Sequence, residues 1–456
     1  MMKMADYQGK EVLVLGLAKS GTEAARILLD LGAVVTVNDQ TPYEENQAAK
    51  ELEKLGATVV CGSHPDSLVH GDLDLMIKNP GIPYRHSLIQ KAMRLSIPVV
   101  TEIELAWQIA PCDMIGITGS NGKTTTTTMT AKMLEGGMKT PVAAGNIGEV
   151  ASKEAYRATS EHVLVVELSS FQLQGTRHFN PHIAVFLNLV EAHLDYHGTM
   201  EEYASAKSRL FLNQSEEDFL IYNLDDVEVS RLTVDAKSRC IPFSTSSAPK
   251  GGSFLQNGMI YILGEPLMRV EDFALPGEYN LSNALAAATA AVLAGANREQ
   301  VRRVMMTFSG VRHRLQYVDT IGDVTYYNNS KATNVPATVK ALEAFGNRKM
   351  ILIAGGLDRK LSFQGLKDPM NQTAKAVITY GETAEQLAMT AKEAGVPTIL
   401  SAETLQEAVE QSRAISEPGD IVLLSPACAS WDQFKTFEER GECFIEAVRK
   451  IKEETP

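Results

Sequence analysis

This chain of 456 residues has little of several features that mark common classes of protein. Its five cysteines show neither metal-site spacing nor a disulfide framework, so we expect reduced thiols. Basic residues do not predominate: the net charge of −13 argues against general binding of nucleic acid or anionic membranes. No apolar run approaches the roughly 18 residues needed to span a bilayer, and residues 1–10 lack a signal peptide's apolar region. We therefore expect a cytoplasmic protein without a membrane segment.

Short apolar runs alternate with helix patterns along the whole chain, which predicts an α/β protein of about three domains. In the first unit, strands at 11–15 and 34–37 flank a helix at 22–31. The turn GLAKSG at 16–21 is similar to a dinucleotide fingerprint, although Ala18 replaces the second glycine. The third unit, from about Gly310, has the alternation of a mostly parallel, doubly wound sheet.

The clearest motif is the glycine-rich loop GSNGKT at residues 119–124, which follows an apolar run and begins a helix pattern. Its glycines let backbone N–H groups approach a polyphosphate, Lys123 neutralises charge, and the Thr124 hydroxyl can ligate Mg²⁺. Ile117 occupies the position of the first glycine in the longer GxxxxGK[ST] loop, so this is the shorter form. The alternative is an ordinary strand–helix turn, but the context favours a nucleoside triphosphate site.

Glu167 and His193 are candidates for metal chemistry. Glu167 lies in the apolar run 163–168, where a carboxylate is costly unless it is paired or binds a metal. Magnesium coordination and a salt bridge are both compatible with that position. His193 and His197 are four residues apart and would share one face of a helix, but no third zinc ligand is evident. We favour a single histidine, His193, next to Mg²⁺-nucleotide chemistry.

Lys207 interrupts an apolar stripe. On a helix it would share one face with Tyr203, Leu210 and Phe211. Most such lysines extend to solvent or pair with a carboxylate. The alternative is a desolvated lysine with a lowered pKa that reacts with CO₂. The resulting carbamate would supply an oxygen ligand for a second Mg²⁺.

Further polar clusters stand at helix starts and strand ends. Asn280 and Asn283 lie at the start of a predicted helix, where they either contact a nucleotide base or cap the helix. Arg314 lies at the second domain junction. The runs at 328–334 and 425–432 each follow a predicted strand, at the sheet edge where α/β folds bind ligands.

Together these motifs resemble the Mur ligases, the ATP-dependent ligases of peptidoglycan precursor synthesis. The resemblance extends from Gly16 to Phe437. GSNGKTT identifies the wider family, which includes the folylpolyglutamate synthases. ELSSFQL at 167–173, NSKATN at 329–334 and SPACASWD at 425–432 are similar to the branch that adds D-glutamate. The DNPR motif of the members that add diaminopimelate or lysine is absent.

The resemblance implies three α/β domains. These are a Rossmann-like N-terminal domain at 1–105 for the UDP substrate, a P-loop ATPase domain at 106–309, and a Rossmann-like C-terminal domain at 310–456 for the amino acid. It implies that ATP converts the carboxylate of UDP-N-acetylmuramoyl-L-alanine to an acyl phosphate, which D-glutamate then attacks. Two Mg²⁺ ions and CO₂, as a carbamate on Lys207, are the implied cofactors. The expected state is a monomer with small-molecule partners only, neither nucleic acid nor membrane.

The same resemblance implies roles for individual residues. The UDP-substrate residues are Lys19, Ser20, Asp39, Gln40, Asn79, Gly81 and Asn146. The ATP residues are Gly119, Ser120, Asn121, Gly122, Lys123, Thr124, Thr125, Asn280, Asn283, Arg314 and Asn329. Thr124 and Glu167 would bind one Mg²⁺, and His193 with carbamylated Lys207 the other. The D-glutamate residues are Lys331, Thr333, Arg359, Ser430 and Phe437. The implied catalytic residues are Lys123, His193 and Lys207.

Two departures from the family pattern and three rival functions qualify this interpretation. Many members have Asp at the position of Asn329, near the ATP ribose, and some have lysine at the position of Arg359. The rival functions are another amino-acid ligase of the family, such as a folylpolyglutamate synthase, a nicotinamide-dependent oxidoreductase, and a P-loop switch protein without acyl chemistry.

Overall fold

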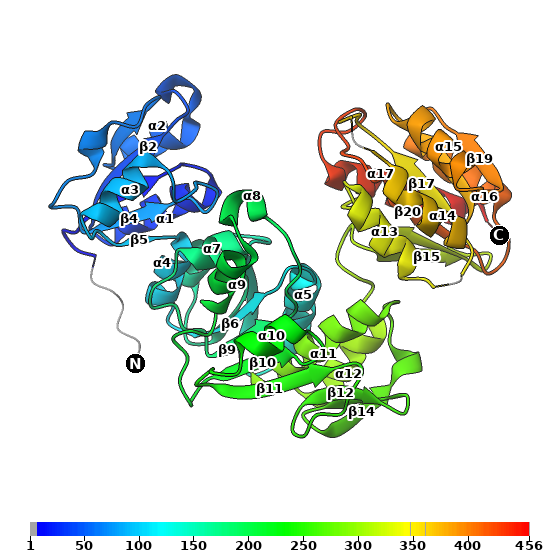
Figure 1. Ribbon diagram of the computed structural model, residues 1–456, viewed down its shortest axis with the longest axis horizontal. Helices are drawn as coiled ribbons and strands as arrows, with labels where there is room; N and C mark the ends of the chain where they lie inside the picture. The colour runs from blue at the N-terminus through cyan, green and yellow to red at the C-terminus, as the bar shows by residue number, and fades with distance from the viewer. Residues whose placement is uncertain (1–6, 347, 361, 456) are drawn as a thin grey trace. The chain divides into compact units, whose positions relative to one another are not determined.

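The computed structural model describes residues 7–346, 348–360 and 362–455, which form two compact units (Figure 1). Unit 1 comprises the chain up to Asp272 together with Ser282–Met306, and unit 2 comprises Phe273–Leu281 and the chain from Thr307. Unit 1 contains two sheets and unit 2 contains one. Helix α4 (Glu102–Ile109) runs across the predicted boundary after residue 105, and the exact domain boundaries stay predictions.

The first sheet of unit 1 is parallel, with strand order β3-β2-β1-β4-β5. Its strands are β1 (Glu11–Leu15), β2 (Val34–Asp39), β3 (Thr58–Cys61), β4 (Leu75–Lys78) and β5 (Val99–Val100). Its helices are α1 (Lys19–Asp30), α2 (Gln47–Lys54) and α3 (Ser87–Arg94), with short 3₁₀ turns at Tyr43–Glu45 and Asp66–Leu68. Helix α1 begins before the predicted residue 22. Gly21 lies in its first turn, where a Cβ would come within 1.9 Å of the Gly16 carbonyl oxygen.

The second sheet of unit 1 has the order β14-β13-β12-β11-β10-β9-β6-β8-β7. Its strands are β6 (Asp113–Thr118), β7 (Thr140–Gly145), β8 (His162–Glu167), β9 (Ile183–Phe186), β10 (Phe219–Asn223), β11 (Arg239–Ser244), β12 (Ser253–Gln256), β13 (Met259–Ile262) and β14 (Glu265–Arg269). Strands β6 to β12 pair in parallel, whereas β13 and β14 add an antiparallel edge. Strand β6 pairs in parallel with β9 on one side and β8 on the other, so the loop that follows β6 lies at the carboxyl edge of these strands.

Short helices follow most of these strands. They are α5 (Lys123–Leu134), α6 (Ala151–Arg157), α7 (Ser170–Gln174), α8 (Leu194–His197), α9 (Met200–Ser208), α10 (Val227–Leu232), α11 (Glu278–Leu293) and α12 (Arg298–Thr307), with a 3₁₀ turn at Val270–Asp272. Helix α9 ends at Ser208, so the predicted helical stripe is wrong for Leu210 and Phe211, which lie beyond the helix. The two expected histidines also do not share a helix face, because His193 is the left-handed N-cap of α8 (φ 58°).

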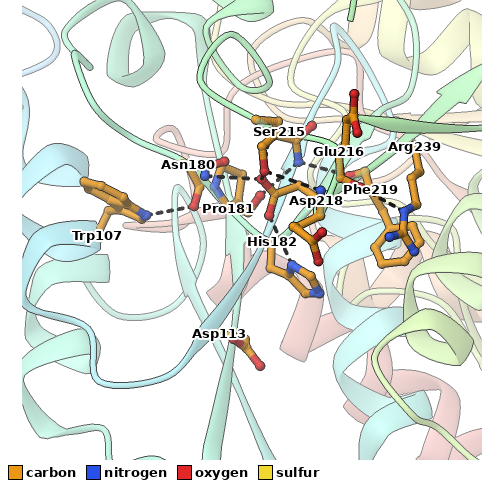
Figure 2. Close-up of polar contacts among 12 residues, drawn as sticks. Trp107, Asp113, Asn180, Pro181, His182, Ser215, Glu216, Asp218, Phe219 and Arg239 are labelled. Atoms are coloured by element: carbon orange, nitrogen blue, oxygen red, sulfur yellow. Dashed lines mark hydrogen bonds and ion pairs between the residues drawn. The ribbon is translucent and has the colours of Figure 1, made fainter. Parts of the chain in front are cut away.

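A dense polar cluster lies at the amino ends of β9 and β10. Figure 2 shows Asn180, His182 and Ser215 pointing toward Asp218, whose Oδ1 is 3.1 Å from His182 Nδ1. Burial would raise the pKa of Asp218, but hydrogen bonds from Ser215, His182 and Asn180 bring it below the usual value. These contacts tie the two strands together at the end of the sheet opposite the loop after β6.

Unit 2 is a six-stranded sheet with order β15-β16-β20-β17-β18-β19. Its strands are β15 (Gln316–Ile321), β16 (Val324–Asn328), β17 (Met350–Gly355), β18 (Ala374–Tyr380), β19 (Thr398–Ser401) and β20 (Ile421–Leu424). Its helices are α13 (Val335–Glu343), α14 (Lys367–Thr373), α15 (Ala384–Glu393), α16 (Leu405–Ile415) and α17 (Phe437–Glu454), with a 3₁₀ turn at Gln364–Leu366. All pairs except β15–β16 are parallel, which confirms the predicted mostly parallel sheet.

Candidate functional site

The loop after β6 has the geometry of a phosphate cradle. Gly122 adopts a left-handed conformation (φ 82°) and is the N-cap of α5. A Cβ on Gly122 would lie 2.1 Å from Asn283 Oδ1, and one on Gly119 would lie 2.9 Å from Leu187 Cβ. Lys123 Nζ donates to the carbonyl oxygens of Gly119 (2.8 Å) and Ser120 (2.9 Å). The lysine therefore lies folded over the loop that would hold a triphosphate at a helix N-terminus.

Two residues to which the sequence assigned no role at this loop contact it. Asn188 follows β9 and accepts from the backbone N–H of Asn121 (2.8 Å) through its side-chain oxygen, while its Nδ2 donates to the Asn121 carbonyl (3.1 Å). The Tyr203 hydroxyl is 3.0 Å from Ser120 Oγ. The only available signal was the position of Asn188 directly after the apolar run 183–187.

Glu167 ends β8 and is 2% exposed. Its Oε1 accepts from Asn146 Nδ2 (2.7 Å), whereas its buried Oε2 has no hydrogen-bond partner among the described residues. An unpartnered buried carboxylate oxygen costs several kcal/mol unless an additional group binds it. No ion pair between described residues includes Glu167, which is against the salt-bridge alternative, and the residue fits a magnesium ligand.

Lys207, on α9, is 1% exposed and lies beside the same loop. Its Nζ donates to the Gly119 carbonyl (2.8 Å) and to Thr118 Oγ1 (3.4 Å), and it lies 4.8 Å from the centre of the Tyr203 ring. Burial, and then the nearby charge of Lys123, lower the pKa of Lys207 well below its usual value, although Glu167 opposes this. The side chain is therefore buried instead of extended to solvent, and no ion pair between described residues includes it. The lowered pKa favours the neutral amine, which is the form of a lysine that reacts with CO₂.

The two histidines differ in their surroundings. His193 packs its ring against Phe171 (5.0 Å between centroids), and burial together with the charges of Lys123 and Lys207 lowers its pKa. A neutral imidazole can act as a metal ligand. His197 is buried, and its Nε2 is 2.9 Å from Ser170 Oγ. Burial, His193 and Lys207 lower the pKa of His197 to about 4, so this ring stays neutral in the core.

The described residues contain no cluster of three or more His, Cys, Asp or Glu side chains able to hold a metal. An Mg²⁺ site at this loop therefore depends on other oxygen donors. The Thr124 hydroxyl, and a carbamate if Lys207 carried one, are oxygen donors of that chemistry.

The candidate UDP-substrate residues of the first sheet follow the carboxyl ends of β1, β2 and β4. Asp39 Oδ2 accepts from the Leu17 N–H (2.6 Å) and Oδ1 from the Thr41 N–H (2.8 Å). Asn79 donates to Ser20 Oγ (3.2 Å) and accepts from the Gly81 N–H (3.1 Å). Lys19 and Gln40 are exposed next to them. Asn146 lies elsewhere, against Glu167 in the second sheet.

In unit 2 the candidate amino-acid residues lie in the segments that follow β16, β17 and β20 and at the first residue of α17. Lys331 Nζ lies 3.7 Å from the centre of the Phe437 ring. The Arg359 guanidinium lies 4.6 Å from the exposed ring of Trp431, which follows buried Ser430. Thr333 lies two residues after Lys331 in the same loop.

Two of the candidate nucleotide residues make hydrogen bonds within the protein, and a third is exposed. Asn329 is buried, accepts from the Leu315 N–H (3.2 Å) and donates to Ser425 Oγ (3.0 Å). Asn280 donates to the Pro276 carbonyl (2.6 Å) from the first turn of α11, so it is not the helix cap. Arg314 is exposed after the turn that begins at Val311.

Three domain families match the chain. They are the "Mur ligase MurD-like, N-terminal domain" over residues 10–101, the "Mur ligase middle domain" over 117–291, and the "Mur ligase, glutamate ligase domain" over 313–428. No helix in the described ranges is both long and apolar enough to cross a membrane.

The chain is similar to other proteins over almost its full length. A UDP-N-acetylmuramoylalanine--D-glutamate ligase of Geobacillus sp. (strain WCH70) is 51% identical over 452 residues, which are 99% of this chain and 100% of that relative. A protein of the same name from Halalkalibacterium halodurans is 49% identical over 453 residues, again 99% and 100%. Among solved structures, UDP-N-acetylmuramate-alanine ligase MurC from Thermotoga maritima has a TM-score of 0.58 at 19% identity, covering 97% of this chain and 100% of its own.

The MurF ligase of Thermotoga maritima, solved with ADP, has a TM-score of 0.56 at 15% identity, covering 100% of this chain and 97% of its own. These structures confirm the three-domain α/β fold. Fold and site together define an ATP-dependent ligase built around a P-loop. The chain belongs to the Mur ligase family, and its activity is that of a ligase of peptidoglycan synthesis.

Proposed function

We propose that this enzyme joins D-glutamate to UDP-N-acetylmuramoyl-L-alanine with the hydrolysis of ATP to ADP and phosphate. The identity of the substrates rests on the relatives that share about half of its residues over their full length and carry that name. The observation that supports the chemistry is the pairing, beside one phosphate loop, of an unpartnered buried carboxylate oxygen on Glu167 and a buried lysine, Lys207.

The first chemical problem is that both reactants are anions. The substrate carboxylate must approach the γ-phosphate of ATP, and repulsion opposes this approach. Lys123 supplies one positive charge at the loop, and the backbone N–H groups at the start of α5 supply a partial positive charge. Thr124 and Glu167 would hold one Mg²⁺, and His193 with carbamylated Lys207 a second, and the ions would neutralise phosphate charge.

The first step forms a bond between a carboxylate oxygen of the substrate and the γ-phosphorus, and it breaks the bridging P–O bond to ADP. The Lys123 ammonium group would stay close to the negative charge of the phosphate during this transfer. The neutral amine nitrogen of D-glutamate then attacks the acyl carbon. The tetrahedral intermediate releases the amine proton to water and collapses with cleavage of the C–O bond to inorganic phosphate. The product is an amide, and the atoms balance without any further reactant.

The acceptor groups lie on unit 2. We propose that Lys331, Thr333, Arg359, Ser430 and Phe437 bind D-glutamate, because two of them are cations that lie over aromatic rings in unit 2. Stacking limits the motion of a long cationic side chain and so orients its charge for a carboxylate. Arg359 would take the role of the lysine found in other members.

The remaining assignments concern the other substrates. We propose that Lys19, Ser20, Asp39, Gln40, Asn79, Gly81 and Asn146 bind the UDP-linked substrate. The loop residues Gly119 to Thr125, with Asn280, Asn283, Arg314 and Asn329, would bind ATP. We further propose that the enzyme acts as a monomer in the cytoplasm.

The test is phosphate release with ATP, UDP-N-acetylmuramoyl-L-alanine and a panel of amino acids. We expect release with D-glutamate to exceed release with D-alanine, L-alanine or L-lysine by at least about a hundredfold, because a site that hydrogen-bonds a side-chain carboxylate rejects ligands without one. Equal rates across the panel would refute the acceptor. Release that needs neither substrate would instead favour a nucleotide switch.

A further inference from the structure

A buried lysine that no motif singled out lies next to the candidate UDP-substrate residues. Lys78 is the last residue of β4 and is 1% exposed. Its Nζ donates to the carbonyl oxygens of Asn79 (3.3 Å), Pro80 (3.1 Å) and Ile82 (3.0 Å). The ammonium group thus lies inside the turn 79–82 and binds three of its four carbonyls.

The same turn is also contacted by α8, a helix of unit 1 that follows β9. Lys78 Nζ lies 3.3 Å from the Tyr196 hydroxyl, on α8. That hydroxyl in turn lies within hydrogen-bonding distance of the carbonyls of Pro80 (3.1 Å) and Ile82 (3.2 Å). Lys78 Nζ and the Tyr196 hydroxyl therefore contact the same two carbonyl oxygens.

This contact continues toward the phosphate loop through aromatic rings. The Tyr196 ring packs edge-on against Phe171, with 4.5 Å between centroids, and Phe171 also packs against His193. A continuous set of contacts therefore connects the turn that carries Asn79 and Gly81 to His193, the candidate metal ligand.

A lysine is energetically unfavourable at this buried position. The ion pairs of the described residues do not include Lys78, and burial lowers the pKa of Lys78 to about 7. Burying an amine without a carboxylate costs free energy that an apolar residue at a strand end would not. Such a cost is typical of a group that orients a binding site rather than one that stabilises a core.

We propose that Lys78, together with Tyr196, is a positioning residue for the UDP-linked substrate: it fixes the turn 79–82 at the distance from His193 that the substrate spans. The inference rests on the proposed function, because it takes Asn79 and Gly81 as substrate contacts. The ligand class it concerns is a sugar nucleotide whose diphosphate lies near the turn and whose far end reaches the phosphate loop.

The test compares wild type with Lys78→Met, which keeps the length of the side chain, and with Tyr196→Phe, which keeps the ring on Phe171. Both variants should raise the KM and the Kd for UDP-N-acetylmuramoyl-L-alanine by about tenfold to a hundredfold, because a misplaced contact loses binding geometry. The KM for ATP, the KM for D-glutamate and the Kd for ADP should change less than about twofold. Lys54→Met, a change at an exposed lysine on α2, is the control and should equal wild type.

The double variant supplies the second readout. Because both groups hold one turn, Lys78→Met with Tyr196→Phe should weaken substrate binding little more than Lys78→Met alone. A purely structural lysine would lower the melting temperature and the active fraction but leave the Kd of the folded protein unchanged, and that result overturns the inference. If Lys78→Met does not fold, an unchanged Kd in Tyr196→Phe overturns it equally.

Titration calorimetry of the substrate needs no turnover, so it separates the two proposals. A wild-type enzyme that binds the substrate without forming product refutes the proposed function and leaves the Lys78 comparison valid. A wild-type enzyme that does not bind it overturns the inference as well.

Discussion

At the scale of single residues, Lys207 carries the most specific chemical prediction. Replacing Lys207 by alanine removes the proposed carbamate, and we expect kcat to fall by at least about a hundredfold, since even outer partners of metal sites are worth about tenfold to a hundredfold. A short carboxylate such as propionate should restore part of the activity by supplying the missing oxygens. Lys237→Ala, at an exposed lysine, is the control. Loss of activity without any rescue would argue that the lysine acts as an amine.

Glu102, on α4, yields a prediction about pH. Burial raises the pKa of Glu102 from 4.5 to about 7, although hydrogen bonds from Ser152 and Gln172 oppose the shift. Its folded-state pKa lies above the unfolded value, so its contribution is fully present below pH 4.5 and is lost as pH rises through about 7. Between these limits wild type should lose about 3 kcal/mol more unfolding free energy than Glu102→Gln. Urea titrations near pH 4.5 and pH 8 measure this, and parallel curves for both proteins would contradict it.

At the scale of elements, Gly122 connects the phosphate loop to α11. Alanine at Gly122 would adopt a left-handed conformation, which costs about 1–2 kcal/mol, and its Cβ would meet Asn283. We expect weaker ADP binding, by about tenfold, together with a lower melting temperature. Gly136→Ala is the matched control, because Gly136 has φ 76° with no atom within 4 Å of a Cβ. Gly136→Ala should lower the melting temperature without weakening ADP binding. Equal ADP affinities in the two variants would refute the role of the contact between residue 122 and Asn283.

The strands that the sequence predicted are those with continuous apolar runs. The run at 421–424 is strand β20 as expected, and the run at 163–168 is β8 within one residue. Strands β7 and β15 were not predicted because TPVAAG and QYVDTI are short of consecutive large apolar residues. Both are edge strands, where one side needs no buried partner, so their pairing depends on the neighbouring strand rather than on their own composition.

At the scale of the whole molecule, residues with proposed roles are divided between the two units. Lys123, Glu167 and Lys207 belong to unit 1, whereas Lys331 and Ser430 belong to unit 2. Under the proposed function, formation of one amide bond needs both sets in the liganded enzyme, and closure would exclude water from the acyl phosphate. We therefore predict that the radius of gyration in small-angle scattering falls when a non-hydrolysable ATP analogue and the UDP-linked substrate bind together. Identical scattering curves with and without ligands would contradict this closure.

Some properties of this protein follow from local order along the chain and others only from packing. The phosphate loop is local, because a strand, two glycines, a lysine and a helix start are consecutive, so GSNGKT alone indicated a triphosphate site. The family resemblance also follows from local order, because its motifs are short runs of consecutive residues. Burial is not local: whether Glu167 forms a salt bridge and whether Lys207 reaches solvent depend on residues far along the chain, and only the packed structure decided both. Lys78 shows most clearly what the sequence alone could not predict, since its partner Tyr196 is 118 residues away and neither residue stands in a motif.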